Sequence, residues 1–167
     1  MATNLIHTAI GTAIKWADSA QTPDNNLTLS ALAADAGRVG VQQDLTATHA
    51  RLYEWRATVQ MGTAGVVGET IDIWLSTSDG TNPDGEEGIA DAALGSTDSL
   101  KNMIYVGSVT VDTTTINVDI TGSGTVAVNA RYVSVVVHNN TADALKTDTG
   151  VHSVTLTPVP DQVQAAV

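Results

Sequence analysis

Apolar and polar positions alternate with a period of two along residues 103–140. In the middle of this stretch Ile116, Val118 and Ile120 fall on one side of the chain, with polar residues between them. This period is typical of a strand with one buried and one solvated face, and the β-branched residues that dominate here favour the same conformation. The pattern predicts three antiparallel strands at 103–112, 115–121 and 131–138, with turns at 112–113 and 122–124.

Further strands are predicted wherever the alternation returns. The strand at 131–138 is apolar on both faces, which is typical of a central strand that is covered on both sides. The stretch 27–33 fits both a helical and a strand spacing, and we favour a short strand that ends near Ala33. The remaining predicted strands cover 12–16, 37–44, 52–61, 69–76 and 150–159, and Pro158 with Pro160 is expected to end the last one.

Polar and glycine-rich segments separate these strands. Residues 22–26 and 139–143 predict turns, and residues 79–88 form the clearest loop in the sequence. One helical turn is expected at 89–94, stopped by Gly95.

Together these elements predict an all-β fold. We expect an antiparallel β-sandwich, jelly-roll-like, with about eight to ten strands. A single domain over residues 11–160 would lie between an N-terminal arm at 1–10 and a C-terminal tail at 161–167.

Charge and composition narrow the classes of function. The chain has 7 Lys and Arg residues against 18 Asp and Glu residues, a formal net charge of -11. Nucleic-acid binding needs clustered basic residues, and an acidic surface disfavours anionic lipids, so we expect neither nucleic acid nor membrane as a partner. No apolar run reaches the ~20 residues that cross a bilayer, and the N-terminus lacks a signal-peptide pattern. Cysteine and phenylalanine are absent, so stability should come from backbone pairing, aliphatic burial and self-association.

The acidic loop at 79–88 is the strongest candidate for a metal site. Its side chains offer the oxygen ligands that Ca²⁺ prefers, but the position of Gly88 does not fit an EF-hand. A solvated turn explains the same residues, and we favour it, so no metal or cofactor is expected. The oxygen-bearing residues are Asp79, Asn82, Asp84, Glu86 and Glu87.

Other motifs of chemistry are missing from the sequence. The four histidines lie singly, although His138 and His152 stand on strands that could be neighbours. No nucleophile elbow, P-loop or dinucleotide fingerprint occurs, and the chain is predicted not to be an enzyme. Asn26 and Asn139 begin Asn-x-Thr sequences, which we interpret as turn chemistry.

Three stretches resemble structural proteins of tailed bacteriophages. Residues 29–44 are similar to a leucine- and alanine-rich segment followed by Gly, Arg and a strand ending in Asp. Residues 73–80 resemble a central strand that runs into a Ser-x-Asp-Gly loop. Residues 135–145 resemble a late strand that ends in Asn-Asn-Thr before a small-residue turn and Leu. The three stretches span most of the chain in the right order.

This resemblance implies a non-enzymatic virion protein, most of all a capsid decoration (cement) protein. Such a protein would bind the major capsid protein on the outer surface of the head and stabilise contacts between capsomers. A homotrimer is implied, because decoration proteins commonly occupy three-fold positions. If this holds, we expect contacts through the N-terminal arm, the 79–95 loop and the C-terminal tail. The individual residues expected to make capsid or subunit contacts are Leu5, Ile6, His7, Ile10, Trp74, Asn82, Pro83 and Asp84.

The alternative is a carbohydrate- or receptor-binding jelly-roll module of a phage fibre or tail. Trp16, Trp55 and Trp74 could supply a face on which sugars stack, although Trp55 falls on the predicted core side of its strand. Trp74 lies opposite the apolar side of its own strand, where a single Trp more often covers a sheet edge or meets a loop than binds a ligand. A glycosidase or lyase sandwich has no motif in its favour.

Overall fold

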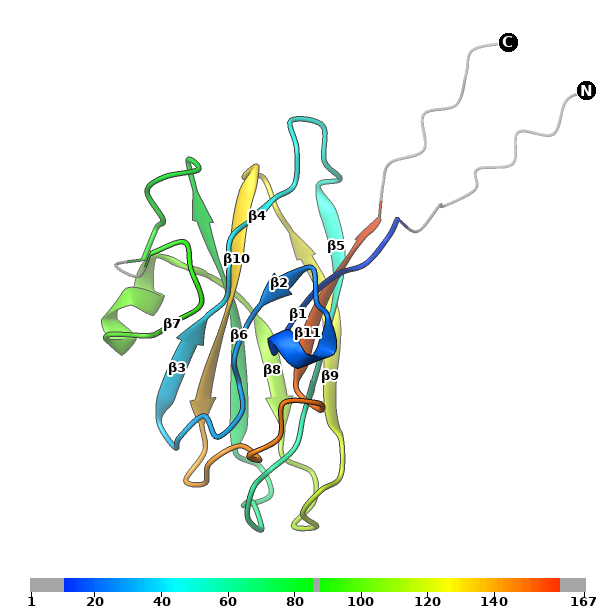
Figure 1. The fold of residues 1–167 in the computed structure, drawn as a ribbon, viewed down its shortest axis with the longest axis vertical. Coiled ribbons are helices and arrows are strands. Elements are labelled where there is room, and N and C mark those ends of the chain that lie inside the picture. Colours follow the sequence, from blue (N-terminus) through cyan, green and yellow to red (C-terminus); the bar gives the residue numbers. More distant parts are fainter. Residues whose placement is uncertain (1–10, 86–87, 160–167) are drawn as a thin grey trace, which may run out of the picture.

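The computed structural model describes residues 11–85 and 88–159, which form two β-sheets packed face to face (Figure 1). Two short 3₁₀ helices, η1 (Ser19–Gln21) and η2 (Thr97–Asn102), interrupt the strands. Sheet A contains, in spatial order, β2 (Asn25–Asn26), β1 (Ile14–Ala17), β11 (Ser153–Val159), β5 (Leu52–Val59) and β9 (Ile120–Ala127). Sheet B contains β7 (Ala92–Ala93), β3 (Ala36–Val39), β10 (Tyr132–Asn140), β6 (Thr70–Ser78) and β8 (Ile104–Thr110), and β4 (Gln43–Asp44) also pairs with β10.

The eight longer strands are connected as a jelly roll. Antiparallel pairs are nested along the chain: β1 with β11 outermost, then β3 with β10, β5 with β9, and β6 with β8 innermost. The first and third pairs share sheet A, and the second and fourth share sheet B. This is the topology of a long hairpin wrapped into two layers. The predicted all-β, jelly-roll-like sandwich is confirmed.

The strands with the strongest alternation lie where the sequence predicts them. Every second residue of β5 from Tyr53 to Val59 is buried in the core between the sheets, as is the apolar side of β6. The central position of β10 is also confirmed, since Val133 to Val137 are buried on both sides of sheet B.

The predicted strand at 115–121 is wrong. Asn117 adopts a left-handed backbone conformation with φ of 61°, which breaks an extended chain and which asparagine tolerates. Ile116 and Val118 are therefore exposed in a loop, and β9 begins only at Ile120.

The predicted turn at 122–124 is wrong for a related reason, because these residues lie within β9. A Cβ atom at Gly124 would lie 2.7 Å from Nε1 of Trp55, and one at Gly107 in the facing sheet would lie 2.5 Å from its Cζ2. These glycines leave room for the buried indole, so here glycine marks close packing and not a reversal of the chain.

Three other predictions need correction. Residues 27–33 form no strand. They form an irregular segment in which Leu27 and Leu29 are buried and Ala31, in a turn, has a φ of 57°. The expected helical turn at 89–94 is replaced by β7, which pairs with β3, and η2 forms the helical turns further on. The predicted strand at 37–44 is divided into β3 and β4.

The remaining boundaries differ by a few residues. The first strand is shifted to β1, and β11 begins at Ser153 and includes Pro158. Pro160, which was expected to end that strand, lies outside the described residues, as do the predicted arm at 1–10 and tail at 161–167.

A second, smaller apolar cluster covers the outer face of sheet B. The segment that follows β6 returns across this face through β7 and η2, shown in green in Figure 1. Its members are Val39, Leu100, Met103 and Val136, with Trp74, Ala92 and Leu94 packed against them. Within residues 11–85 and 88–159, no helix combines the length and apolar character that a membrane crossing requires.

Candidate interaction surfaces

The predicted contact residues fall into three groups. Leu5, Ile6, His7 and Ile10 lie outside the described residues. Trp74 lies on the outer face of sheet B. Asn82, Pro83 and Asp84 lie in the loop after β6. Among the described residues, no hydrogen bond or ring contact joins Trp74 to Asn82, Pro83 or Asp84.

Trp74 is half-buried beneath its neighbours. Its ring meets that of Tyr105 edge to face, with 4.9 Å between centroids, and it packs against the outer cluster of sheet B. The indole Nε1 is buried without a hydrogen-bond partner among the described residues. The interpretation that this Trp meets a covering segment fits its position, and Tyr105 is the more exposed aromatic of the pair.

The loop after β6 is organised by its own carboxylates. Asp79 accepts hydrogen bonds from the backbone and side-chain nitrogens of Asn82, at 2.7 and 2.8 Å, and from the backbone nitrogen of Thr81 at 2.8 Å. These donors lower the pKa of Asp79 to about 2. Asp84 accepts a hydrogen bond from the Thr77 hydroxyl, and Pro83 bridges to Ser78.

The carboxylates of Asp79 and Asp84 thus accept hydrogen bonds from residues of this loop and of the adjoining end of β6. The described residues contain no group of three or more His, Cys, Asp or Glu side chains placed to hold a metal ion. Glu86 and Glu87, which sequence reasoning added to the ligand set, lie outside the described residues.

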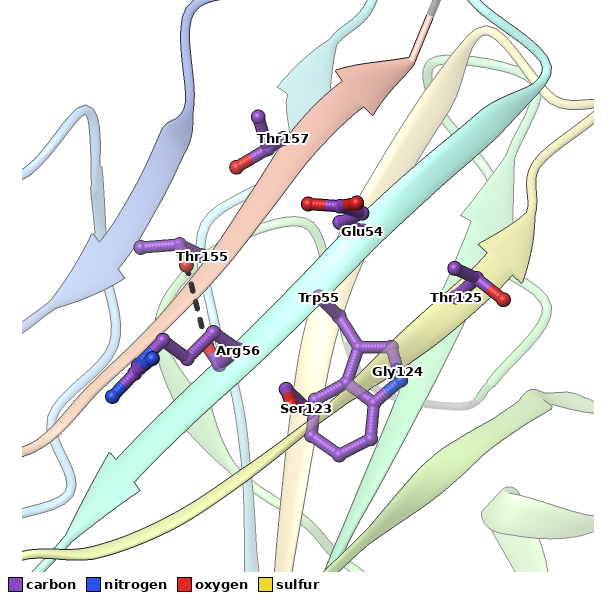
Figure 2. A pocket seen from close by; sticks show the side chains of 8 residues that line it. All are labelled: Glu54, Trp55, Arg56, Ser123, Gly124, Thr125, Thr155 and Thr157. Carbon is purple, nitrogen blue, oxygen red and sulfur yellow. Dashed lines mark hydrogen bonds between the residues drawn. The ribbon is translucent and has the colours of Figure 1, made fainter. Parts of the chain in front are cut away.

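A shallow hollow of about 440 Å³ lies on the outer face of sheet A (Figure 2). Two cross-strand rows build it, each with a charged residue of β5 flanked by hydroxyls of β11 and β9. The rows are Thr155–Arg56–Ser123 and Thr157–Glu54–Thr125, and the backbones of Trp55 and Gly124 run between them.

The charged centre of this hollow is free for a partner. No ion pair within the described part of the chain engages the carboxylate of Glu54 or the guanidinium of Arg56. Figure 2 shows Arg56 extended toward β11, where the Thr155 hydroxyl donates to the Arg56 carbonyl at 3.3 Å. The arrangement offers donors and acceptors to a polar ligand, without an exposed aromatic ring.

Sequence reasoning missed this hollow because it misplaced β9. Glu54 and Arg56 flank Trp55, and they are exposed on the side of the strand opposite its predicted core side. Ser123, however, was assigned to a turn, and the residues that follow it had no strand. The signal that could have identified β9 is the alternation of small hydroxyl residues with glycine from Thr121 to Thr125.

The predicted sugar-stacking face does not form. Trp16 is fully buried and its Nε1 donates to the Val41 carbonyl at 2.8 Å, while Trp55 is only 4% exposed. Neither ring is available to a ligand, so the three tryptophans do not form a common surface on which a sugar could stack.

His138 and His152, whose strands could have been neighbours, lie by strands of different sheets. His138 belongs to β10 and faces the carboxylate of Asp35, with 3.6 Å between Nε2 and Oδ1. His152 precedes β11 and is buried, accepting from the Gln60 amide at 3.4 Å through Nδ1 and bonded to the Lys146 carbonyl at 2.9 Å through Nε2. They do not form a shared site.

Asn139 is the buried polar residue that organises one end of the sandwich. Its amide nitrogen donates to the carbonyls of Leu32, Ala33 and Asp143, and its oxygen accepts from Thr141. The side chain is fully enclosed, which supports the interpretation of this Asn-x-Thr sequence as turn chemistry.

The sequence of the chain matches no protein-family profile and no curated protein.

Proposed function

We propose that this chain is a non-enzymatic structural protein of a bacteriophage virion, most specifically a capsid decoration protein. The observation that carries the proposal is the position of the three phage-like stretches. Residues 29–44 contain β3, residues 73–80 contain much of β6, and residues 135–145 contain much of β10. These strands are hydrogen-bonded neighbours at the centre of sheet B, so stretches that are distant in sequence form one continuous unit.

Two further features support attachment to a large assembly. The backbone nitrogen of Gly11 donates to the Pro158 carbonyl at 2.9 Å, so the chain enters β1 and leaves β11 at one corner of sheet A. The two ends of the described chain therefore lie side by side and are presented together at this corner. The net charge of -11 would also repel the packaged nucleic acid while leaving protein surfaces accessible.

Co-sedimentation tests this function directly. Purified protein is mixed with heads of the source phage that have been stripped of accessory proteins, and heads that retain them serve as the control with occupied sites. We expect saturable pelleting with stripped heads, at a fixed number of copies per capsomer that is a multiple of three if the protein is a trimer. A protein that stays in the supernatant while stripped heads pellet would refute the decoration role.

The hollow on sheet A favours a second candidate, a carbohydrate-binding module of a fibre or tail. Hydroxyl groups on both sides of Glu54 and Arg56 could pair with the hydroxyls of a glycan. A glycan array probed with wild-type protein and with Glu54→Gln/Arg56→Gln distinguishes the two functions. Binding by the wild type that the double variant loses would favour this candidate, and silence of the wild type would remove it.

A further inference from the structure

Half of the large apolar side chains that are exposed in the described residues gather in two loops. Val66 and Val67 lie between β5 and β6, with 51% and 59% of their surface exposed. Ile116 and Val118 lie between β8 and β9, with 47% and 42% exposed. Single exposed apolar residues are ordinary, whereas a group of them on a soluble protein marks a surface for interaction. We call these four residues the apolar tip.

Hydrogen bonds hold the two loops of the apolar tip together. The backbone of Val111 accepts from the Gly68 amide and donates to the Glu69 carbonyl, both at 2.9 Å. At the other side of the same loops, the Gln60 side-chain amide donates to Asp119 at 2.7 Å. The loops therefore form one unit, and Figure 1 shows them adjacent at the lower end of the sandwich.

Negative charge borders the apolar tip. The two loops and the adjoining loop after β10, residues 60–69, 111–119 and 141–152, contain five carboxylates and one lysine. The lysine, Lys146, is already paired with Asp148 at 3.1 Å. The other carboxylates are tied to this end of the sandwich or exposed on it: Glu69 to the Ala142 amide, Asp143 to Thr63, Asp119 to Gln60, and Asp112 beside Val111.

We propose that the apolar tip is the surface that docks onto the phage head, at a capsid site with an apolar centre and a basic rim. The inference rests on the proposed function and identifies the face that performs it. Charge decides between the possible occupants of the surface. A second copy would bring a second acidic rim against the first, and an anionic membrane would repel it, whereas a basic rim on the capsid would be attracted.

The experiment uses the stripped heads and three proteins: the wild type, the tip variant Val66→Ser/Val67→Ser/Ile116→Ser/Val118→Ser, and the control Leu52→Ser. Leu52 is as exposed as Val118 (both 42%), but it lies at the other end of β5. Urea unfolding checks that all three proteins are folded, and sedimentation velocity gives the oligomeric state of each. We expect the tip variant to bind heads roughly tenfold more weakly or worse, the control to bind as the wild type does, and wild-type binding to weaken as salt rises.

Each other outcome overturns the inference. If the tip variant binds as tightly as the wild type, the apolar tip is not the docking surface, while the decoration function stands. If the wild type does not pellet with heads, both the function and the docking surface fail. If the tip variant changes the oligomeric state of the free protein, the apolar tip joins copies of this chain and does not face the capsid.

Discussion

At the scale of single residues, the packing of Trp55 explains the composition of two strands. The indole lies in the core between the sheets, and glycines on both sheets leave the space that it fills. With no phenylalanine in the chain, this large ring supplies burial that the small aliphatic residues around it cannot.

Replacement of Gly124 by Ala should therefore destabilise the fold. The new Cβ would lie 2.7 Å from Trp55 Nε1, and overpacking of this kind costs about 1–3 kcal/mol. Urea unfolding of Gly124→Ala measures the loss, and Gly88→Ala, whose new Cβ meets no atom of the described residues within 4 Å, is the matched control. In the Trp55→Phe background the Gly124→Ala penalty should shrink, because the clashing atom is gone. An equal penalty in both backgrounds would show that the strain lies elsewhere.

His152 makes stability depend on pH. Burial lowers the pKa of this imidazole below 6.5, and the ring is neutral because its Nδ1 accepts from the Gln60 amide. As pH falls below 6.5 the unfolded chain takes up the proton first, so the stability that the neutral ring contributes is present above this pH and is lost below it.

Urea unfolding between pH 7.5 and 5.5 should show this loss in the wild type. His152→Gln should be less stable at pH 7.5 and should have a flatter profile over the range, whereas His49→Gln, at a half-buried position in the loop after β4, should retain the wild-type slope. A slope that persists in His152→Gln would assign the titration to another group.

At the scale of elements, one carboxylate anchors the segment that covers sheet B. Asp91 accepts from Arg38 Nε and from the Thr28 hydroxyl, both at 2.6 Å, and so links β3 and the segment before it to the start of β7. Burial raises the pKa of Asp91, but the hydrogen bonds from Arg38 and Thr28 prevail and lower it. The carboxylate is thus held in its charged form.

Asp91→Ala should loosen the covering segment and cost about 2–3 kcal/mol, since it removes hydrogen bonds to a charged, largely buried acceptor. Hydrogen exchange should show faster exchange at the Leu94 amide, which bonds to the Gly37 carbonyl, with little change in β5. Asp98→Ala, which breaks an exposed pair with Lys101, should leave both measurements unchanged. Equal exchange at Leu94 in the wild type and Asp91→Ala would contradict the anchoring role.

Some of the strands could be predicted from the sequence and others could not. β5 was predictable because alternating residues fix one buried face, and β10 was predictable because its run is apolar on both faces. β9 was not, because its inward positions include Gly122 and Gly124, which carry no apolar signal of their own. Their role depends on Trp55, which lies far away in the sequence, and on the sheet that faces it.

At the scale of the whole molecule, the fold was predictable and the candidate interaction surfaces were not. Alternation and turn spacing indicate a sandwich, because they depend on local sequence. The hollow on sheet A and the apolar tip each combine residues from strands or loops that only the jelly-roll topology brings together. Ile116 and Val118 illustrate the difference, since their alternation predicts a buried face and the turn at Asn117 exposes them.

The hydrogen bond between Gly11 and Pro158 brings the two ends of the described chain close together. The strands could therefore keep their places in the sheets if the chain began and ended elsewhere. A circular permutant, with residues 11 and 159 joined by a short glycine-serine linker and new ends between Ala47 and Thr48 in an exposed loop, would keep every strand pair. We expect it to unfold cooperatively with a far-ultraviolet circular dichroism spectrum like that of the parent. Failure to fold would show that the natural order of synthesis matters. If it folds, polypeptides attached at residues 47 and 48 would be displayed at a different site from the corner where β1 and β11 meet.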